Sequence, residues 1–502
     1  MSSLPDAGGR GGLGLFALLA AVFTICLATL PDDIYPGDPV AMRISAAALL
    51  KFGEPGLPTH RVEQRDLRKL VTGSYFAENE ERGRWYSKYG ILTTLLYLPP
   101  LAVERLLGGE LSLAELGTSS LRLILGLYQL GFVLLAAFYL HRLAALYARS
   151  RITPPVFAVC VLFATFTWNY ARAQSSEIFQ LAFFLGFYVH LICWRRTGAQ
   201  RDLHFSEIWL VLLVLTKSFH IVLVPLLAIL ALTRDWDRTT AAWTSLEREL
   251  RTRWRFHLVH LWAPMLLLGL LLLGVNGYKF GDPFATGYAE GPHVVGIFGG
   301  SFLEGLSGFL FGPQRSVFTH FPLLLLSLLG VVSFARRFPF ELTLAWAVFL
   351  IYLLSLSNYV YWDGSWSYGP RYLLLVLPLV SLPFVEVIDG FSRNLRLWAL
   401  AVPVVLVVLG ISVTLQWNVN GLPFLSHLYV SRLFTAIQSP HIDAFFTKQH
   451  VGFVHRDLIA WREGEASLEP IEIARTSVSQ ARLESLELTL RAMLRPNYRW
   501  AQ

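Results

Sequence analysis

Apolar runs of about twenty residues recur along this chain, and they constrain its fold more than any other feature. The first run occupies residues 13–30, and the chain as a whole is 54% hydrophobic and 15% charged. A soluble protein of this size would carry about 25% charged residues. A helix of about twenty apolar residues spans the hydrocarbon core of a bilayer. The sequence therefore predicts an all-α integral membrane protein.

We expect about eleven transmembrane helices, with amphipathic helices in the first outer loop. The expected spans cover residues 12–31, 119–140, 153–171, 178–194, 206–216, 219–233, 258–275, 320–335, 339–358, 371–388 and 397–417. The fifth and sixth form a broken pair around Lys217. The alternative is a single long span, 206–233, with the lysine inside it.

Clusters of Arg and Lys in the short loops set the orientation, because such clusters favour the cytoplasmic side. They lie at residues 142–151, 195–201, 234–255, 336–337 and 393–396. All of them fall on one face if the pair around Lys217 is broken, and they contradict one another if it is a single span. The N-terminus is then cytoplasmic. The loops 32–118, 276–318 and 359–370 and the tail then lie outside.

The remaining composition predicts a simple domain organisation. Cys26, Cys160 and Cys193 fall in or at the end of apolar spans and offer neither a disulfide framework nor metal-ligand spacing. There is no internal repeat and no Gly-rich phosphate loop of the soluble nucleotide-binding kind, and we expect no nucleic-acid partner. We expect one transmembrane domain over residues 1–417 and a small outer segment over residues 418–502.

Three acids, Asp32, Asp33 and Asp38, follow the first span and stand at the membrane surface. An amphipathic stretch leads from them to Gly53. Aspartate is well suited to cap a helix, but a cap explains only one acid of the three. A carboxylate here is positioned to take a proton from an acceptor hydroxyl, and Asp38 is the preferred candidate.

Cations near the membrane surface are the next candidates, because ionisable groups at membrane depth are costly. Lys88 follows Tyr86 in RWYSKYG, where a lysine either snorkels or binds an anion. Lys217 lies at the helix break, close to His220. Arg371, between Tyr368 and the next span, is of the residue type that binds phosphate oxygens in a bidentate way.

Further polar residues accompany these cations. Glu177 stands at the start of the fourth span, where an acid suits the helix dipole or adds a second carboxylate to the site. Aromatic residues near Arg371, Trp366 among them, form an interfacial belt or stack on a sugar ring. The loop between the seventh and eighth spans adds Lys279, Asp282, Tyr288, Arg315 and His320.

In this order the motifs resemble the GT-C superfamily of polytopic glycosyltransferases, in the bacterial branch related to aminoarabinose, mannosyl and Rgt-type transferases. The resemblance covers roughly residues 12–390. GDPVAMRISAAALLKFG is similar to the acidic pair and helix of the first outer loop, with Pro39 in place of the second acid. YSKYG, LTKSFHIVLVP, NGYKFGDPFATGY and SYGPRYLLLVLPLV are similar to later family motifs.

The resemblance implies an inverting glycosyltransferase at the outer face of the bacterial inner membrane. It would move a sugar from a polyprenyl-phosphate donor to a hydroxyl of a glycan, lipid or protein. Asp38 or Asp33 would be the base, with Glu177 as a further catalytic acid residue. Lys88, Lys217 and Arg371 would bind the donor phosphate. The wider set of substrate-binding candidates is Tyr86, His220, Lys279, Tyr288, Arg315, His320, Trp366 and Tyr368.

No cofactor is required by this interpretation. A divalent metal is not indicated, although Asp33, Asp38 and Glu177 could share one. Three alternatives stay open on the sequence: a transporter or flippase of lipid-linked sugars, a ligase with a diphosphate-linked donor, and a membrane scaffold.

Overall fold

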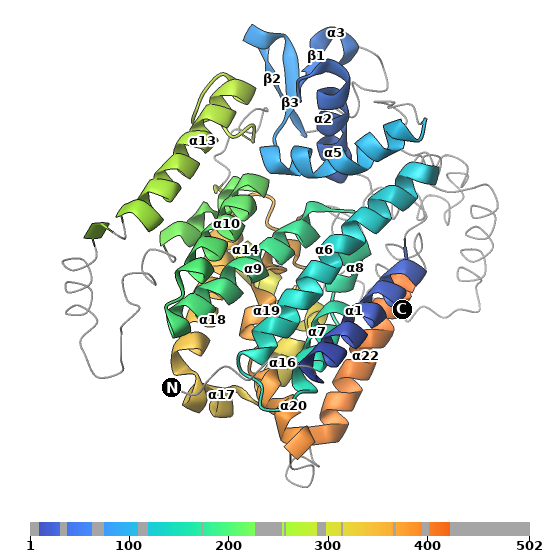
Figure 1. Ribbon diagram of the computed structural model, residues 1–502, viewed down its shortest axis with the longest axis vertical. Helices are drawn as coiled ribbons and strands as arrows, with labels where there is room; N and C mark the ends of the chain where they lie inside the picture. Colours follow the sequence, from blue (N-terminus) through green and yellow to red (C-terminus); the bar gives the residue numbers. More distant parts are fainter. Residues whose placement is uncertain are drawn as a thin grey trace. The chain divides into compact units, whose positions relative to one another are not determined.

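The computed structural model describes a mostly helical chain (Figure 1). The described residues are 10–30, 38–62, 75–108, 119–172, 174–225, 254–255, 258–288, 298–312, 315–364, 368–393 and 401–421. Four helices are long and apolar enough to cross a membrane: Leu123–Ala145, Ser176–Thr197, Ala263–Phe280 and Pro339–Ser357. The all-α membrane class is thus borne out in outline, and the count of eleven spans stays a prediction.

The chain divides into two compact units. The first unit contains residues 1–34, 147–173 and 298–502, and the second contains residues 35–146 and 174–297. The expected boundary at residue 417 stays a prediction, since the described part of the chain ends at residue 421.

The second unit carries the described part of the expected first outer loop and three of the long apolar helices. Its elements are α2 Asp38–Phe52, β1 Leu57–Pro58, α3 Thr59–Val62, β2 Phe76–Asn79, η1 Glu80–Arg82, β3 Arg84–Ser87, α5 Ile91–Leu106, α6 Ser119–Ala145, α9 Ser176–Thr197, α10 Gln200–Thr216, η2 Ser218–Val222, the π-helix η3 Leu258–Trp262 and α13 Ala263–Phe280.

Helices α9 and α10 form a tight hairpin at the centre of this unit. Gly198 turns the chain in the left-handed region, at φ 76°, and its N–H donates to the carbonyl of Trp194 over 2.7 Å. This is a glycine helix cap. Gly186 lets the ring of Trp209 lie against α9, where a Cβ would approach that ring to 2.9 Å. Close packing of this kind leaves most of α9 buried.

A small antiparallel sheet within residues 57–87, in the expected first outer loop, corrects the expectation of helices alone in this loop. Its strand order is β1-β3-β2, with Leu57 opposite Trp85 and Phe76 opposite Ser87. Tyr86 is fully buried in its core with Ala77 and with Phe280 of α13. Strands of two to four residues are too short to show alternation of polar and apolar residues, so periodicity does not predict them.

Helix α2 ends where the sequence predicts, but its surroundings differ from the expectation. It closes at Phe52, and Gly53 follows in the left-handed region at φ 74°. The expected amphipathic helix would expose a polar face. Instead every residue from Pro39 to Ala48 is buried. Arg43 and Ser45 of this helix therefore face protein, and Lys51 at its end is exposed.

The first unit contains the other described helices. Its elements are α1 Arg10–Ala28, α7 Thr153–Phe163, α8 Thr167–Arg172, α14 Phe302–Phe311, α15 Val317–His320, α16 Leu323–Ser327, α17 Val331–Arg337, α18 Pro339–Ser357, η4 Arg371–Leu373, α19 Leu377–Val380, α20 Phe384–Arg393 and α22 Ala401–Gly421.

Three spans expected to be continuous are interrupted in this unit: 153–171, 320–335 and 371–388. The first breaks between α7 and α8, where the Thr165 hydroxyl donates to the carbonyl of Val161 and the N–H of Phe166 donates to His320. At the second break Gly330 lies so close to the chain at Pro383 that a Cβ would approach the carbonyl oxygen to 2.1 Å. Irregular backbone at membrane depth is tolerated where protein buries it.

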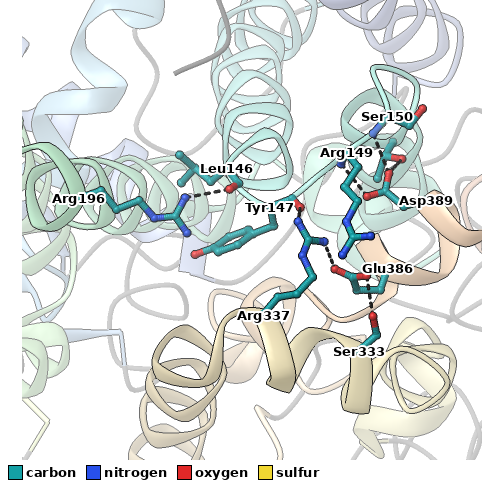
Figure 2. A network of polar contacts seen from close by, with 10 residues as sticks. Leu146, Tyr147, Arg149, Ser150, Arg196, Ser333, Arg337, Glu386 and Asp389 are labelled. Atoms are coloured by element: carbon teal, nitrogen blue, oxygen red, sulfur yellow. Dashed lines mark hydrogen bonds and ion pairs between the residues drawn. The ribbon is translucent and has the colours of Figure 1, made fainter. Parts of the chain in front are cut away.

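Two acids of α20 hold the surrounding helices together (Figure 2). Asp389 accepts the N–H groups of Arg149 and Ser150 over 2.7 and 3.0 Å, just before α7 begins. These N–H groups belong to the turn that precedes α7, outside any helix. Glu386 pairs with Arg337 of α17 and accepts the hydroxyl of Ser333 over 2.8 Å. These contacts favour a structural role for this end of the unit.

Candidate active site

Asp38 stands at the start of α2, half-buried, as the sequence predicts for a helix-capping acid. Its Oδ1 accepts the phenolic O–H of Tyr89 over 2.5 Å. Hydrogen bonds to a carboxylate favour its charged form. Asp38 is therefore held by a donor from a distant part of the loop.

Tyr89 connects the acid to a lysine. Its backbone carbonyl accepts Nζ of Lys279 over 2.7 Å, from the last turn of α13. The carbonyl of Lys279 itself accepts the amide of Asn79 over 3.3 Å. The sequence predicts Asp38 and Lys279 as separate candidates, and Tyr89 brings them to the same short segment.

Lys88 lies among tyrosine rings. Its Nζ is 4.8 Å from the ring centre of Tyr288, 5.7 Å from that of Tyr75 and 5.8 Å from that of Tyr89. Such rings attract a cation through their faces. The lysine thus keeps a defined position, half-buried, next to the residue that holds Asp38.

The predicted helix break at Lys217 is confirmed, and it lies against the same segment. Helix α10 ends at Thr216, and Lys217 is extended, at φ −154° and ψ 114°, before η2 begins. The first half of the pair is longer than expected and starts at Gln200; the residues after 225 lie outside the described part. Gly90 packs on the end of α10, where a Cβ would lie 2.2 Å from the carbonyl oxygen of Leu215.

Glu177 is buried in the first turn of α9, and its charge acts on the hydroxyl of Tyr97 from α5. Burial raises the pKa of the Tyr97 phenol, Arg43 lowers it, and the carboxylates of Glu177 and Asp38 raise it. Both predicted acids therefore act on one phenol. Tyr97 donates its O–H to the carbonyl of Gln174.

His220 and Tyr86 have protein partners in the second unit. Nε2 of His220 lies 2.8 Å from Oε1 of Gln180, whose amide nitrogen donates to Ser176 over 2.9 Å. His220 is thus tied to the first turn of α9, beside Glu177. Tyr86 lies in the core of the sheet, and burial raises its pKa to about 12.

The other candidates belong to the first unit and form a cluster of their own. Burial lowers the pKa of Arg315 to about 10, Asp363 raises it, and nearby Arg371 lowers it. The ring centres of His320 and Tyr368 are 5.0 Å apart. Arg315 donates to the carbonyl of Gly369 over 3.4 Å. Asp33 and Trp366 lie outside the described residues.

Sequence reasoning missed three residues here: Tyr89, Tyr97 and Arg43. Tyr89 directly follows Lys88 and reads as part of an aromatic belt. Tyr97 reads as one apolar position among many in ILTTLLYLPP. Of these three residues, Arg43 alone could be singled out from the sequence, because an arginine inside the apolar turns of a short helix is costly to bury.

Comparison with known proteins finds solved structures that are similar to this chain at low identity. No family model and no curated protein matches the chain. A crystal structure of ArnT from Cupriavidus metallidurans, bound to undecaprenyl phosphate, is similar over 96% of this chain and 72% of that one, at 14% identity and a TM-score of 0.44. The oligosaccharyltransferase of Archaeoglobus fulgidus, in the apo form, is similar over 83% of this chain, at 11% identity and a TM-score of 0.44.

This chain spans 55% of the length of that archaeal enzyme. The function proposed below rests on the residues of the site and on the order of the sequence motifs.

Proposed function

We propose that this chain is an inverting membrane glycosyltransferase of the GT-C kind. It transfers a sugar from a polyprenyl-phosphate donor to the hydroxyl of a glycan, lipid or protein. The reaction takes place at the outer face of the bacterial inner membrane, with the N-terminus in the cytoplasm and the C-terminus outside.

One observation carries the proposal: the segment Lys88–Tyr89 brings an acid, Asp38, together with two lysines, Lys88 and Lys279. Tyr89 donates to Asp38 and accepts from Lys279, and Lys88 directly precedes it. Gly90, the residue after Tyr89, packs on the C-terminal end of α10. Lys217 directly follows that end. A transferase needs this combination, because it must remove a proton and stabilise a leaving phosphate in the same step.

The reaction follows from these groups. Asp38 takes the proton of the acceptor hydroxyl, which contributes a factor of about 10² to 10⁴. The hydroxyl oxygen forms a bond to the anomeric carbon, through an oxocarbenium-like transition state. The bond from that carbon to the phosphate oxygen breaks with its electron pair. Lys88, Lys217 and Lys279 stabilise the charge that develops on the polyprenyl phosphate.

Two further assignments come from the sequence motifs. Arg371, in the first unit, is proposed to bind donor phosphate as well, and Arg315 lies near it. Glu177 is the alternative base. Neither assignment is needed for the chemistry at Asp38.

The test is sugar transfer by the purified full-length chain from a panel of labelled donors. The panel contains polyprenyl-phosphate and polyprenyl-diphosphate sugars. Asp38→Asn should lose at least a hundredfold in kcat and still bind polyprenyl phosphate. Asp282→Asn is the matched control, because Asp282 is exposed and caps a turn at Phe284.

Other results would redirect the proposal. Full activity of Asp38→Asn, with loss in Glu177→Gln, would move the base to Glu177. Transfer from diphosphate donors alone would make the chain a diphosphate-dependent ligase. Movement of labelled lipid across vesicles without transfer would make it a transporter.

A further inference from the structure

Residues 368–371 form a tight turn in the first unit, and Arg371 stands at its end. Gly369 lies in the left-handed region, at φ 64°, and Pro370 has φ −79° and ψ 65°. The N–H of Arg371 donates to the carbonyl of Gly369 over 2.9 Å. These values describe an inverse γ-turn with proline at its centre, where the ring fixes φ. The backbone therefore enters Arg371 in one defined direction.

Aromatic rings pack closely against this turn. A Cβ at Gly369 would lie 3.0 Å from a ring carbon of His320 and 3.0 Å from one of Phe166. The N–H of Phe166 donates to the carbonyl of His320 over 3.0 Å, which joins the two residues. The ring centre of His320 is 5.0 Å from that of Tyr368. The turn thus has little room to move on this side.

Three buried side chains from distant parts of the chain donate hydrogen bonds to the first two residues of the turn. The phenolic O–H of Tyr170, on α8, donates to the carbonyl of Tyr368 over 2.8 Å. The amide of Gln416, on α22, donates to the phenolic oxygen of Tyr368 over 3.2 Å. Nη1 of Arg315 donates to the carbonyl of Gly369 over 3.4 Å. All three donors are buried, and a buried hydrogen bond is stronger than one exposed to water.

Gln416 belongs to the polar side of an otherwise apolar helix. Ser412 lies four residues before it, on the same face of α22. Its hydroxyl donates to the carbonyl of Ala164, at the break between α7 and α8. Ser412 and Gln416 are buried, whereas apolar side chains of the same helix are exposed: Val404, Leu406, Val407 and Ile411. The motif resemblance ends near residue 390, so it assigns no role to α22.

Helix packing alone does not explain where these hydrogen bonds end. Polar side chains in a span also stabilise helix association by bonding to a neighbouring helix, and the contact of Ser412 is of this kind. Tyr170 and Gln416 lie on different helices, yet both donate to Tyr368, three positions before Arg371. Their convergence on one short turn favours a role in fixing that turn.

We propose that Tyr170 and Gln416 are positioning residues, which hold the turn so that the guanidinium of Arg371 meets the donor phosphate. The inference rests on the proposed function, in which Arg371 binds this phosphate. Tyr372 supports the side chain of Arg371: its hydroxyl accepts Nη2 over 2.9 Å, and its ring centre is 4.8 Å from Cζ. A cation that is held in place before the ligand arrives loses less conformational freedom on binding.

The test is a double-mutant cycle on the binding of labelled polyprenyl phosphate to the purified full-length chain in nanodiscs. Tyr170→Phe and Gln416→Met each remove one donor and nearly keep the side-chain volume. Each should raise the dissociation constant about two- to tenfold, as expected for one hydrogen bond. In the Arg371→Met background neither change should have an effect, because both residues act through Arg371. The same factor in both backgrounds would overturn the proposal, as would unchanged binding in the wild-type background.

Two variants control for the loss of any buried polar group in this unit. Tyr147→Phe removes another buried phenol, which packs on the rings of Phe334 and Phe338. Ser412→Ala removes the other buried polar side chain of α22 that bonds away from the turn. Both variants should keep the wild-type dissociation constant, even where thermal unfolding shows a loss of stability. A loss of binding in these controls equal to that of Gln416→Met would overturn the proposal.

A measurement on the wild-type chain decides the question where a variant does not fold. The backbone N–H groups of Gly369 and Arg371 should have NMR order parameters of about 0.85 before ligand is added. Values below about 0.6 would overturn the proposal, because a mobile turn cannot position the arginine.

Binding and transfer together separate this inference from the proposed function. A chain that shows the expected coupling but transfers no sugar from any donor would reject the transferase and keep the role of the turn. Normal transfer without coupling to Arg371 would reject the role of the turn alone. A wild-type chain that binds no polyprenyl phosphate would reject both.

Discussion

Tyr89 donates its phenolic O–H to Oδ1 of Asp38 over 2.5 Å, across 51 positions of sequence. The carbonyl of the same tyrosine accepts Nζ of Lys279 from the end of α13. One residue thus joins the proposed base to a lysine. Because the phenol donates to the carboxylate, it stabilises the charged form that a general base requires.

Tyr89→Phe should therefore reduce transfer while the fold remains. A hydrogen bond to a charged group contributes about 1.5–3 kcal/mol, and about 1.4 kcal/mol corresponds to a factor of ten in rate. We expect kcat/KM to fall about ten- to a hundredfold, measured with the best donor of the panel. Tyr128→Phe, on α6, is the control and should keep its activity. Equal activity of both variants would show that the contact with Asp38 is dispensable.

Gly90→Ala should separate the segment Lys88–Gly90 from α10. A Cβ there would lie 2.2 Å from the carbonyl oxygen of Leu215 and 2.4 Å from that of Thr216. The backbone of Gly90, at φ −58°, suits any residue, so the effect is steric. We expect a loss of stability of about 1–3 kcal/mol and a larger loss of transfer, measured by thermal unfolding and kinetics.

The control for this change is Gly131→Ala, also in the second unit. A Cβ at Gly131 meets nothing within 4 Å. Alanine in a helix is more favourable than glycine by up to about 1 kcal/mol, so this variant should be neutral or slightly more stable. An active, stable Gly90→Ala protein would mean that the segment does not depend on its contact with α10.

The sequence predicts the helices better than their interruptions. Hydropathy identifies the long apolar helices, and it places the break at Lys217, because a charge interrupts the apolar run there. No charged residue interrupts the apolar run at the break between α7 and α8. It depends on hydroxyl and carbonyl contacts such as those of Thr165 and Phe166. Tertiary partners of this kind cannot be read from local composition.

In the candidate site too, the sequence predicts individual residues but not the tertiary contacts between them. Asp38, Lys88 and Lys279 are predictable one by one, since each is an ionisable group beside an apolar segment. The contacts of Asp38 and Lys279 with Tyr89 are not predictable. They depend on packing between residues that are separated by 51 and by 190 positions in the sequence. The burial of Arg43 is not predicted, because the sequence indicates an amphipathic helix at this position. A polar face toward solvent would have explained an arginine that is in fact buried.

Transfer should not depend on a divalent metal. In the proposed reaction Lys88, Lys217 and Lys279 stabilise the leaving phosphate, so no metal is needed for that charge. Treatment of the purified chain with EDTA, followed by removal of the chelator, should leave kcat unchanged. Loss of activity that Mg²⁺ or Mn²⁺ restores would contradict this expectation. It would direct attention to the acids Asp33, Asp38 and Glu177 as ligands.

Lys217→Met should weaken the binding of the leaving group more than it harms the fold. The lysine is half-buried at the break between α10 and η2, where the extended backbone at φ −154° interrupts the helix. A charge-assisted contact to phosphate contributes about 1.5–3 kcal/mol. Product inhibition by polyprenyl phosphate should therefore weaken about tenfold or more, and Lys217→Arg should recover part of it. Lys51→Met removes an exposed lysine at the end of α2 and should leave inhibition unchanged. Unaltered inhibition in Lys217→Met would assign the helix break a structural role and leave the phosphate to Lys88 and Lys279.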